Sequence, residues 1–225
     1  MGYQVPDIEY PTIKPPKHRL RYLSHDEEKR LLVEINPRRE GSGFPVYTKR
    51  SEKLKCELQD IHDIVVVLLD TGARYSEITG LQWSRVNLID KTISLWRSKV
   101  QNESVLFMTD RVCRILSRRQ VERTSEFVFT NSTGCQRGES TRSIRNAIKR
   151  AGLTDVTVHT FRHTHASRLI QNGMSIYEVK EILGHSDIKT TMRYAHLEQR
   201  DVSRRAREII NQINTETEKP TLKVV

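Results

Sequence analysis

The chain has 225 residues, enough to bury one substantial hydrophobic core, with 38 lysines and arginines against 28 aspartates and glutamates. The formal charge of +10 is typical of proteins that bind polyanions, although a face of solvated lysines and arginines gives the same number. Three scattered cysteines without C-x-x-C spacing, the lack of a signal segment and a longest apolar run of residues 64–69 argue against disulfide-rich, secreted and membrane-spanning classes, and a cytoplasmic protein is expected.

The N-terminal part of the chain is predicted to be an arm followed by a first helix. Residues 1–22 contain four prolines and little apolar periodicity, which is typical of a linker. Ser24 and Glu27 then form a capping-box pattern that predicts a helix over residues 25–35. Residues 37–55 are charged and contain glycine, and they predict a surface loop.

The middle of the chain changes from helical to strand periodicity and back. Apolar positions at helical spacing predict a central core helix over residues 57–70, with Gly72 as its stop, and a short amphipathic helix over residues 75–81. In residues 91–109, apolar residues alternate with polar ones on both sides of a polar loop, which predicts a β-hairpin. Helical spacing returns over residues 111–120.

The C-terminal half is predicted to consist of short helices with sharp ends. FVFT (127–130) indicates a short strand, and residues 141–153 indicate a basic amphipathic helix. The following helices are closed by Gly173 and Gly184, the second after a capping box, and lead into further elements through IKTTMRYAHL and VSRRAREIINQI. The chain is therefore predicted to be mainly α with a small antiparallel β-sheet, an α+β fold without internal repeats.

One segment, VHTFRHTHASRLIQNG, holds three histidines and an arginine within a few positions. His159 and His163 lie four residues apart and would share a helical face, as zinc-binding histidines do. The zinc helices of hydrolases carry a glutamate where Thr160 stands here, and Arg162 adds a permanent cation to the same region. A metal site is therefore disfavoured, and His165 points away from His163.

The same segment also fits a phosphate clamp. His159 and Arg162 are three residues apart at the start of a helix, where free backbone N–H groups and the helix dipole favour an anion. A structural histidine beside a surface arginine remains the alternative for this pair taken alone.

Three further segments carry residues that suit phosphate chemistry. In TGARYSEITGL, Arg74 stands at a helix start with Glu77 one turn later, placed to hold the guanidinium. Lys99 lies in the predicted hairpin loop. In EILGHSDIKTTMRYAHL, His185 follows a glycine and Tyr194 lies on the next element. Taken alone, His185 would be interpreted as a turn residue and Tyr194 as a packing residue.

Taken together, these segments resemble the tyrosine recombinase, or phage integrase, family, in particular the catalytic domain of lambda-type integrases. That family shows an arginine in a TGxRxxE segment, a lysine in a β-hairpin, an HxxR segment, an LGH segment and a tyrosine soon after. The pattern is met in order by Arg74, Lys99, His159 with Arg162, His185 and Tyr194. The similarity runs from about Tyr22 to Ile213.

The resemblance implies an enzyme that breaks and rejoins DNA strands. Arg74 and Arg162 would hold the nonbridging oxygens of a phosphodiester, and His185 would donate a further hydrogen bond. Tyr194 would be the nucleophile and form a 3′-phosphotyrosyl intermediate. Lys99 would protonate the leaving 5′ oxygen.

The remaining residues near these motifs receive supporting roles or none. His159 would act as the general base or proton partner of the tyrosine hydroxyl. Glu77 would orient Arg74, and His163 would be structural or supporting. His165 has no assigned role. The scheme requires no metal and no nucleotide cofactor, since the phosphotyrosyl bond stores the energy for religation.

The implied partners are double-stranded DNA attachment or core sites, a tetramer of recombinase protomers and accessory DNA-bending proteins. The basic helix over residues 141–153 is the candidate for DNA contact, largely to phosphates, although a solvated basic face is the alternative. Its candidate residues are Arg142, Arg145, Lys149 and Arg150.

The resemblance also implies a division of the chain. Residues 1–22 would be a linker, without the helical core-binding domain that usually precedes, residues 23–213 the catalytic domain and residues 214–225 a C-terminal tail. The apolar end of that tail, Leu222, Val224 and Val225, would dock on its own domain or on a neighbouring protomer.

Three functions follow from these observations. The first is a site-specific recombinase for integration and excision of phage or mobile DNA in a bacterial cytoplasm, associated with the nucleoid. The second is a catalytically silent DNA-binding accessory or regulatory protein, against which the filled set of site residues argues. The third is a nicking and closing enzyme of the type IB topoisomerase kind, against which the LGH segment and its short spacing to Tyr194 argue.

Overall fold

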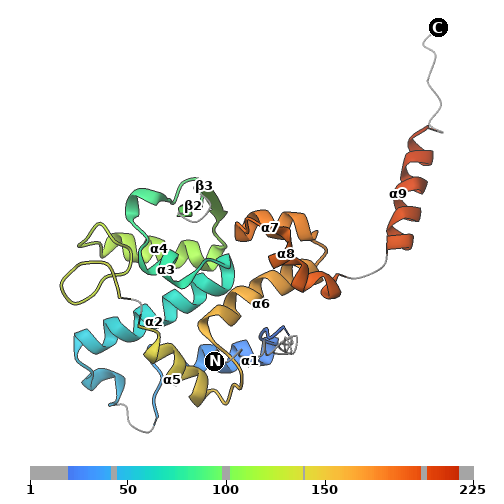
Figure 1. The fold of residues 1–225 in the computed structure, drawn as a ribbon. Coiled ribbons are helices and arrows are strands. Elements are labelled where there is room, and N and C mark those ends of the chain that lie inside the picture. The colour runs from blue at the N-terminus through green and yellow to red at the C-terminus, as the bar shows by residue number, and fades with distance from the viewer. Residues whose placement is uncertain (1–19, 42–44, 98–101, 139, 199–201, 218–225) are drawn as a thin grey trace, which may run out of the picture.

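The structure is a computed structural model that describes residues 20–41, 45–97, 102–138, 140–198 and 202–217. Helices dominate it, and the strands form a small antiparallel sheet (Figure 1). The prediction of a mainly α chain with a small sheet is confirmed. In chain order the elements are α1 (His25–Glu34), η1 (Tyr47–Lys49), α2 (Glu52–Thr71), α3 (Tyr75–Thr79), η2 (Trp83–Arg85), β1 (Val86–Asn87), β2 (Thr92–Arg97), β3 (Asn102–Phe107), α4 (Asp110–Val121), α5 (Arg142–Arg150), α6 (Val158–Gln171), α7 (Ile176–Leu183), α8 (Ile188–Thr191), η3 (Met192–Leu197) and α9 (Val202–Thr217).

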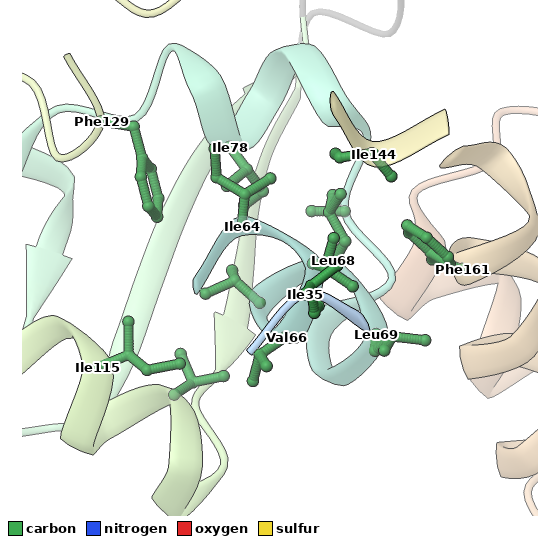
Figure 2. Packing of buried hydrophobic residues seen from close by; sticks show 14 of the residues in the cluster. Ile35, Ile64, Val66, Leu68, Leu69, Ile78, Ile115, Phe129, Ile144 and Phe161 are labelled. Carbon is green, nitrogen blue, oxygen red and sulfur yellow. The ribbon is translucent and has the colours of Figure 1, made fainter. Parts of the chain in front are cut away.

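Helix α2 forms the centre of the molecule. Its residues from Ile64 to Leu69 are buried, and side chains from α3, α4, α5 and α6 pack around them (Figure 2). The helix begins at Glu52, earlier than the apolar pattern predicted, because the Ser51 side chain caps the backbone N–H of Leu54. The surface loop predicted over residues 37–55 is therefore shorter than expected.

The predicted capping boxes are present. The Ser24 and Glu27 side chains close the start of α1, and the Ser175 and Glu178 side chains close the start of α7. In each capping box, side-chain oxygens accept hydrogen bonds from backbone N–H groups at the start of the helix, which have no partner within the helix. Helix α7 ends as predicted at Gly184, which adopts a left-handed conformation with φ 58°.

The sheet pairs β1 with β2 and β2 with β3, all antiparallel, so the predicted hairpin is confirmed. Ile93 stands opposite Leu106, and both side chains are buried. Val105 and Phe107, on the alternate positions of β3, are exposed to solvent. The sequence pattern took Val105 and Phe107 as the apolar residues that alternate with polar ones, which is wrong, because Leu106 between them faces the core.

The predicted strand FVFT is wrong as a strand. Residues 127–130 take part only in isolated bridges, one between Gln82 and Phe127 and one between Thr130 and Gln136. Phe129 is nonetheless fully buried, so the apolar residues of this segment serve the core rather than a sheet.

A network of ion pairs ties α4 and the loop before α5 to α2. Arg119 donates to the buried Asp63 through Nε at 2.8 Å and also pairs with Asp60. Arg137 joins Asp60 at 2.6 Å, and Arg118 pairs with Asp63. Asp63 is fully buried, and removing its carboxylate from water costs free energy. The positive charges of these arginines compensate that cost.

The C-terminal elements, from α6 to α9, extend from the centre of the molecule. Helix α6 leads from α2 to α7 and α8, and α9 stands apart from the other helices (Figure 1). Helix α9 continues to Thr217, so it passes through the boundary predicted after residue 213. The predicted linker, apart from residues 20–22, and the apolar end of the predicted tail lie outside the described residues. Among the described residues, the helices include none that is both long and apolar enough to cross a lipid bilayer.

Candidate active site

Arg74 is fixed by its position at the start of α3. It is the N-cap residue, and its backbone N–H donates to Oε2 of Glu77 at 2.7 Å. Its side chain donates from Nη1 to Oε1 of the same carboxylate at 2.6 Å. Glu77 thus holds both the backbone and the guanidinium of Arg74, which is the contact that the sequence predicted. About a third of the Arg74 side chain, 36%, remains exposed.

The turn that leads from α2 to Arg74 depends on Gly72 and His165. Gly72 has φ 63°, and a Cβ atom there would lie 2.7 Å from Cδ2 of His165. Nδ1 of His165 lies 3.1 Å from the carbonyl oxygen of Leu69, and burial lowers the pKa of this histidine, so its neutral ring donates to that carbonyl. His165, which had no role in the sequence, therefore secures the end of α2.

Arg162 joins the ends of two helices. Its side chain is almost entirely buried, and Nη1 donates to the carbonyl oxygen of Gly72 at 2.7 Å. Nη2 donates to the carbonyl oxygen of Leu183 at 2.6 Å, at the end of α7. The guanidinium therefore lies between the Gly72 turn that precedes Arg74 and the Gly184 turn that precedes His185. No periodicity in the sequence indicated these carbonyl contacts, because they join segments that are far apart in the chain.

His159 is largely exposed on the first turn of α6, where the sequence placed it. Its pKa is lowered by partial desolvation of the ring and then by the positive charges of Arg162, Arg193 and Arg74. Three arginines from separate elements are thus close enough to affect one imidazole. Arg193 was missed by the sequence interpretation, and its position directly before Tyr194 was the available signal.

Tyr194 is almost completely buried, with 1% of its surface exposed. Its hydroxyl lies 2.6 Å from Nδ1 of His163, and the two rings are 5.8 Å apart. Burial raises the pKa of Tyr194, although the charges of Arg193 and Arg162 oppose that shift. The contact of the hydroxyl in this structure is with His163, whereas the sequence interpretation nominated His159 as its proton partner.

His163 lies between His159 and Tyr194. Its ring meets that of His159 edge to face, with centroids 4.6 Å apart. Burial, followed by the charges of His159, Arg193 and Arg162, lowers the pKa of His163 to about 4. The ring is therefore neutral at physiological pH and has one nitrogen able to accept a proton.

His185 follows the left-handed Gly184, as expected for a residue just past a helix end. Its Nδ1 lies 2.8 Å from the hydroxyl oxygen of Thr191, which is fully buried in α8. This contact joins His185 to the element that leads into Tyr194. The contact fixes the orientation of the imidazole ring.

Two groups of residues from the sequence analysis remain to be located, namely Lys99 and the basic residues of α5. Lys99 lies outside the described residues. Helix α5 carries Arg142, Arg145, Lys149 and Arg150 on its exposed face, but Arg150 also donates to Glu34 of α1 at 3.0 Å. Within the described ranges, no group of three histidine, cysteine, aspartate or glutamate side chains is arranged to hold a metal ion.

The geometry can be compared with known proteins. The integrase of Salmonella phage P22 is 29% identical over 221 residues, which cover 92% of this chain and 51% of that protein. The tyrosine recombinase XerA of Thermococcus kodakarensis is 29% identical over 199 residues, or 84% of this chain and 63% of that protein. The chain thus spans about half to two thirds of the length of these relatives.

A solved structure shares the fold. The catalytic domain of bacteriophage HP1 integrase is 28% identical, with a TM-score of 0.59, over 82% of this chain and 92% of that domain. The family model for the phage integrase family matches residues 21–201, from before α1 to beyond η3, and so includes every described residue of the candidate site. The chain therefore belongs to the phage integrase family of tyrosine recombinases.

Proposed function

We propose that this chain is the catalytic domain of a site-specific DNA recombinase, which cleaves and rejoins strands for integration and excision of phage or mobile DNA. The observation that carries the proposal is the joining of four distant segments around Arg162. Its guanidinium binds the turn before Arg74 and the turn before His185, and the next residue along α6 holds the hydroxyl of Tyr194.

The cations of the site suit the charge of a phosphodiester. A phosphodiester resists nucleophilic attack because its nonbridging oxygens are anionic and its leaving alkoxide is poor. Arg74 and Arg162, with His185, would stabilise the extra negative charge of the pentavalent transition state. The exposed edges of Arg74 and His159 mark the side from which DNA would approach.

Tyr194 would attack the phosphorus atom and displace the 5′ oxygen of the next nucleotide. A 3′-phosphotyrosyl bond forms, the bond to the 5′ oxygen breaks, and that oxygen takes a proton, for which Lys99 is the proposed donor. Attack by a free 5′ hydroxyl reverses these steps and releases Tyr194. Energy is kept in the phosphotyrosyl bond, so the proposed reaction proceeds without a nucleotide cofactor or metal.

Because Tyr194 is buried, cleavage in this scheme requires the tyrosine to move. The residue is removed from solvent in the present arrangement, in a hydrophobic cluster that includes Ala166, Ile170 and Leu183. Binding of DNA at Arg74 and His159 would have to bring the tyrosine oxygen and the phosphorus atom together. The proposed partners are DNA core sites and further protomers in a tetramer, with accessory DNA-bending proteins.

A covalent trapping assay tests the proposal. The chain is incubated with a pool of duplexes that have a randomised central sequence and a 5′-bridging phosphorothiolate, and protein–DNA adducts are separated on a denaturing gel. A 5′ thiolate cannot religate efficiently, so adducts accumulate. We expect adducts with the wild-type protein, none with Tyr194→Phe, and no loss of adducts in the presence of a chelator.

Three outcomes would contradict the proposal. Failure of the wild-type protein to form any adduct, with DNA binding retained, would favour the silent DNA-binding alternative. Equal adduct formation by Tyr194→Phe would show that another nucleophile acts. Loss of adducts with chelator would revive a metal role for the histidines of α6.

A further inference from the structure

The hydroxyl of Tyr194 and the imidazole of His163 form the contact from which a further role follows. The oxygen lies 2.6 Å from Nδ1, and His163 is held on α6 one residue after Arg162. In the family resemblance this histidine was only a structural or supporting residue. Its contact is instead with the atom that would attack the phosphodiester.

A buried phenol is a poor nucleophile unless a base takes its proton. The pKa of Tyr194 is raised above its ordinary value of 10.0 by burial, so the hydroxyl keeps its proton at neutral pH. A base must lie within hydrogen-bonding distance of that proton. His163 satisfies this condition, whereas His159, itself exposed, meets the ring of His163 edge to face.

Resting on the proposed function, we propose that His163 is the general base that activates Tyr194. As the bond between the tyrosine oxygen and phosphorus forms, the phenolic proton passes to Nδ1 of His163, and the bond from phosphorus to the 5′ oxygen breaks. In religation the imidazolium returns the same proton to the departing tyrosine oxygen. Lys99 would serve the 5′ oxygen, so the two proton transfers take place on opposite sides of the phosphorus.

The charges around His163 link this role to DNA. His159 and Arg162 on α6 and Arg193 on η3 all disfavour a proton on its ring, and together with burial they lower its pKa to about 4. A phosphate bound beside these cations would bring the opposite charge and raise the basicity of His163. The base would therefore become effective when DNA is bound, which limits premature ionisation of the tyrosine.

A matched pair of variants separates a base from a hydrogen-bonding partner. His163→Asn places an amide near the position of Nδ1, where it can hold the tyrosine hydroxyl but cannot take its proton. His163→Ala removes both functions and leaves room for added imidazole. Single-turnover rates of adduct formation are measured between pH 6 and pH 9 on the duplex that best traps the wild-type protein, with thermal unfolding and DNA binding as folding controls.

The expected results follow from the loss of the base alone. Both variants form adducts about 100-fold or more slowly than the wild-type protein. Their rates rise in proportion to hydroxide concentration, whereas the wild-type rate does not, and free imidazole restores His163→Ala. The defect persists on the bridging phosphorothiolate, because that substrate needs no proton on its leaving group, whereas Lys99→Ala recovers on it.

Three results would overturn the inference while leaving the proposed function intact. These are a His163→Asn rate within a few-fold of wild type, a pH profile parallel to that of wild type, and recovery of His163→Asn on the phosphorothiolate. A larger loss in His159→Asn than in His163→Asn would assign the base to His159. If the wild-type protein itself forms no adduct, the proposed function fails, and the role of His163 fails with it.

Discussion

The hydroxyl of Thr191 lies 2.8 Å from Nδ1 of His185, and Thr191 is wholly buried. A threonine hydroxyl at this position fixes the orientation of the imidazole ring. It also ties His185 to α8, which leads directly into the element that carries Tyr194, so the proposed donor and the proposed nucleophile would shift together.

Thr191→Val tests this link, because valine keeps the shape of threonine and removes only the hydroxyl. We expect adduct formation to slow about tenfold, since a hydrogen bond that orients a charged or polar group contributes about 1 kcal/mol or more. Thr191→Ser restores the hydroxyl and should recover most of the rate. Equal rates for the valine and serine variants would show that packing, rather than the hydrogen bond, is what matters.

Gly72→Ala should destabilise the protein more than an ordinary glycine with positive φ. The left-handed conformation costs about 1 kcal/mol with a Cβ atom, and here that atom would also meet the ring of His165 at 2.7 Å. Gly134→Ala is the matched control, because Gly134 has φ 79° and no neighbour within 4 Å of its added Cβ. Urea unfolding should show a clearly larger loss in free energy of unfolding for Gly72→Ala than for Gly134→Ala. Similar losses for the two variants would show that the contact with His165 does not matter.

Glu77→Gln should weaken catalysis without weakening the fold greatly. Glutamine can still accept from the backbone N–H of Arg74, but it no longer offers a charged partner to the guanidinium at 2.6 Å. We expect about a tenfold slower adduct formation with little change in DNA affinity. A control, Glu52→Gln, removes an exposed carboxylate that pairs with Lys55 and should leave the rate unchanged.

The stability of the fold should depend on pH through His163. An unfolded histidine takes up a proton near pH 6.5, whereas His163 in the native chain does so only near pH 4. Acidification from pH 6.5 to 4 therefore favours the unfolded chain. His159 and His165, whose pKa values are also lowered, act in the same direction.

His163→Asn isolates the share of this effect that belongs to one residue. At pH 7 the wild-type protein should be the more stable, since its neutral imidazole also packs against the rings of His159 and Tyr194, which an asparagine amide does not replace. At pH 5 the difference in free energy of unfolding should narrow, because only the wild-type chain loses stability through this group. Urea unfolding at the two pH values measures this difference in free energy of unfolding. If the difference is the same at pH 7 and pH 5, the lowered pKa of His163 is contradicted.

Local signals in the sequence predicted most of the helices correctly. Ser24 with Glu27 and Ser175 with Glu178 are short-range caps that need only the residues themselves, and both are present. The start of α2 was missed because charged residues after Ser51 hide the helix from a hydrophobic pattern. FVFT was misread because burial of Phe129 in the core gives the same apolar pattern as a strand.

The candidate site residues were proposed from their motifs, whereas their contacts, apart from that between Arg74 and Glu77, were not predicted. Nothing in the spacing of α6 shows that His163, rather than His159, meets Tyr194, because that depends on how η3 packs against α6. The role of His165 has the same origin, since its partner on α2 is 96 positions away in sequence. Tertiary geometry decides which of several histidines performs which task.

The two carbonyl contacts of Arg162 bear on how such a chain could lose its activity. A mutation of this arginine would leave the ends of α2 and α7 without their shared donor, as well as removing a cation from the proposed phosphate site. Relaxed selection on recombination would thus still conserve Arg162 for folding. Among descendants of this chain, retention of the partly exposed Arg74 is the better sign that the proposed strand exchange is still under selection.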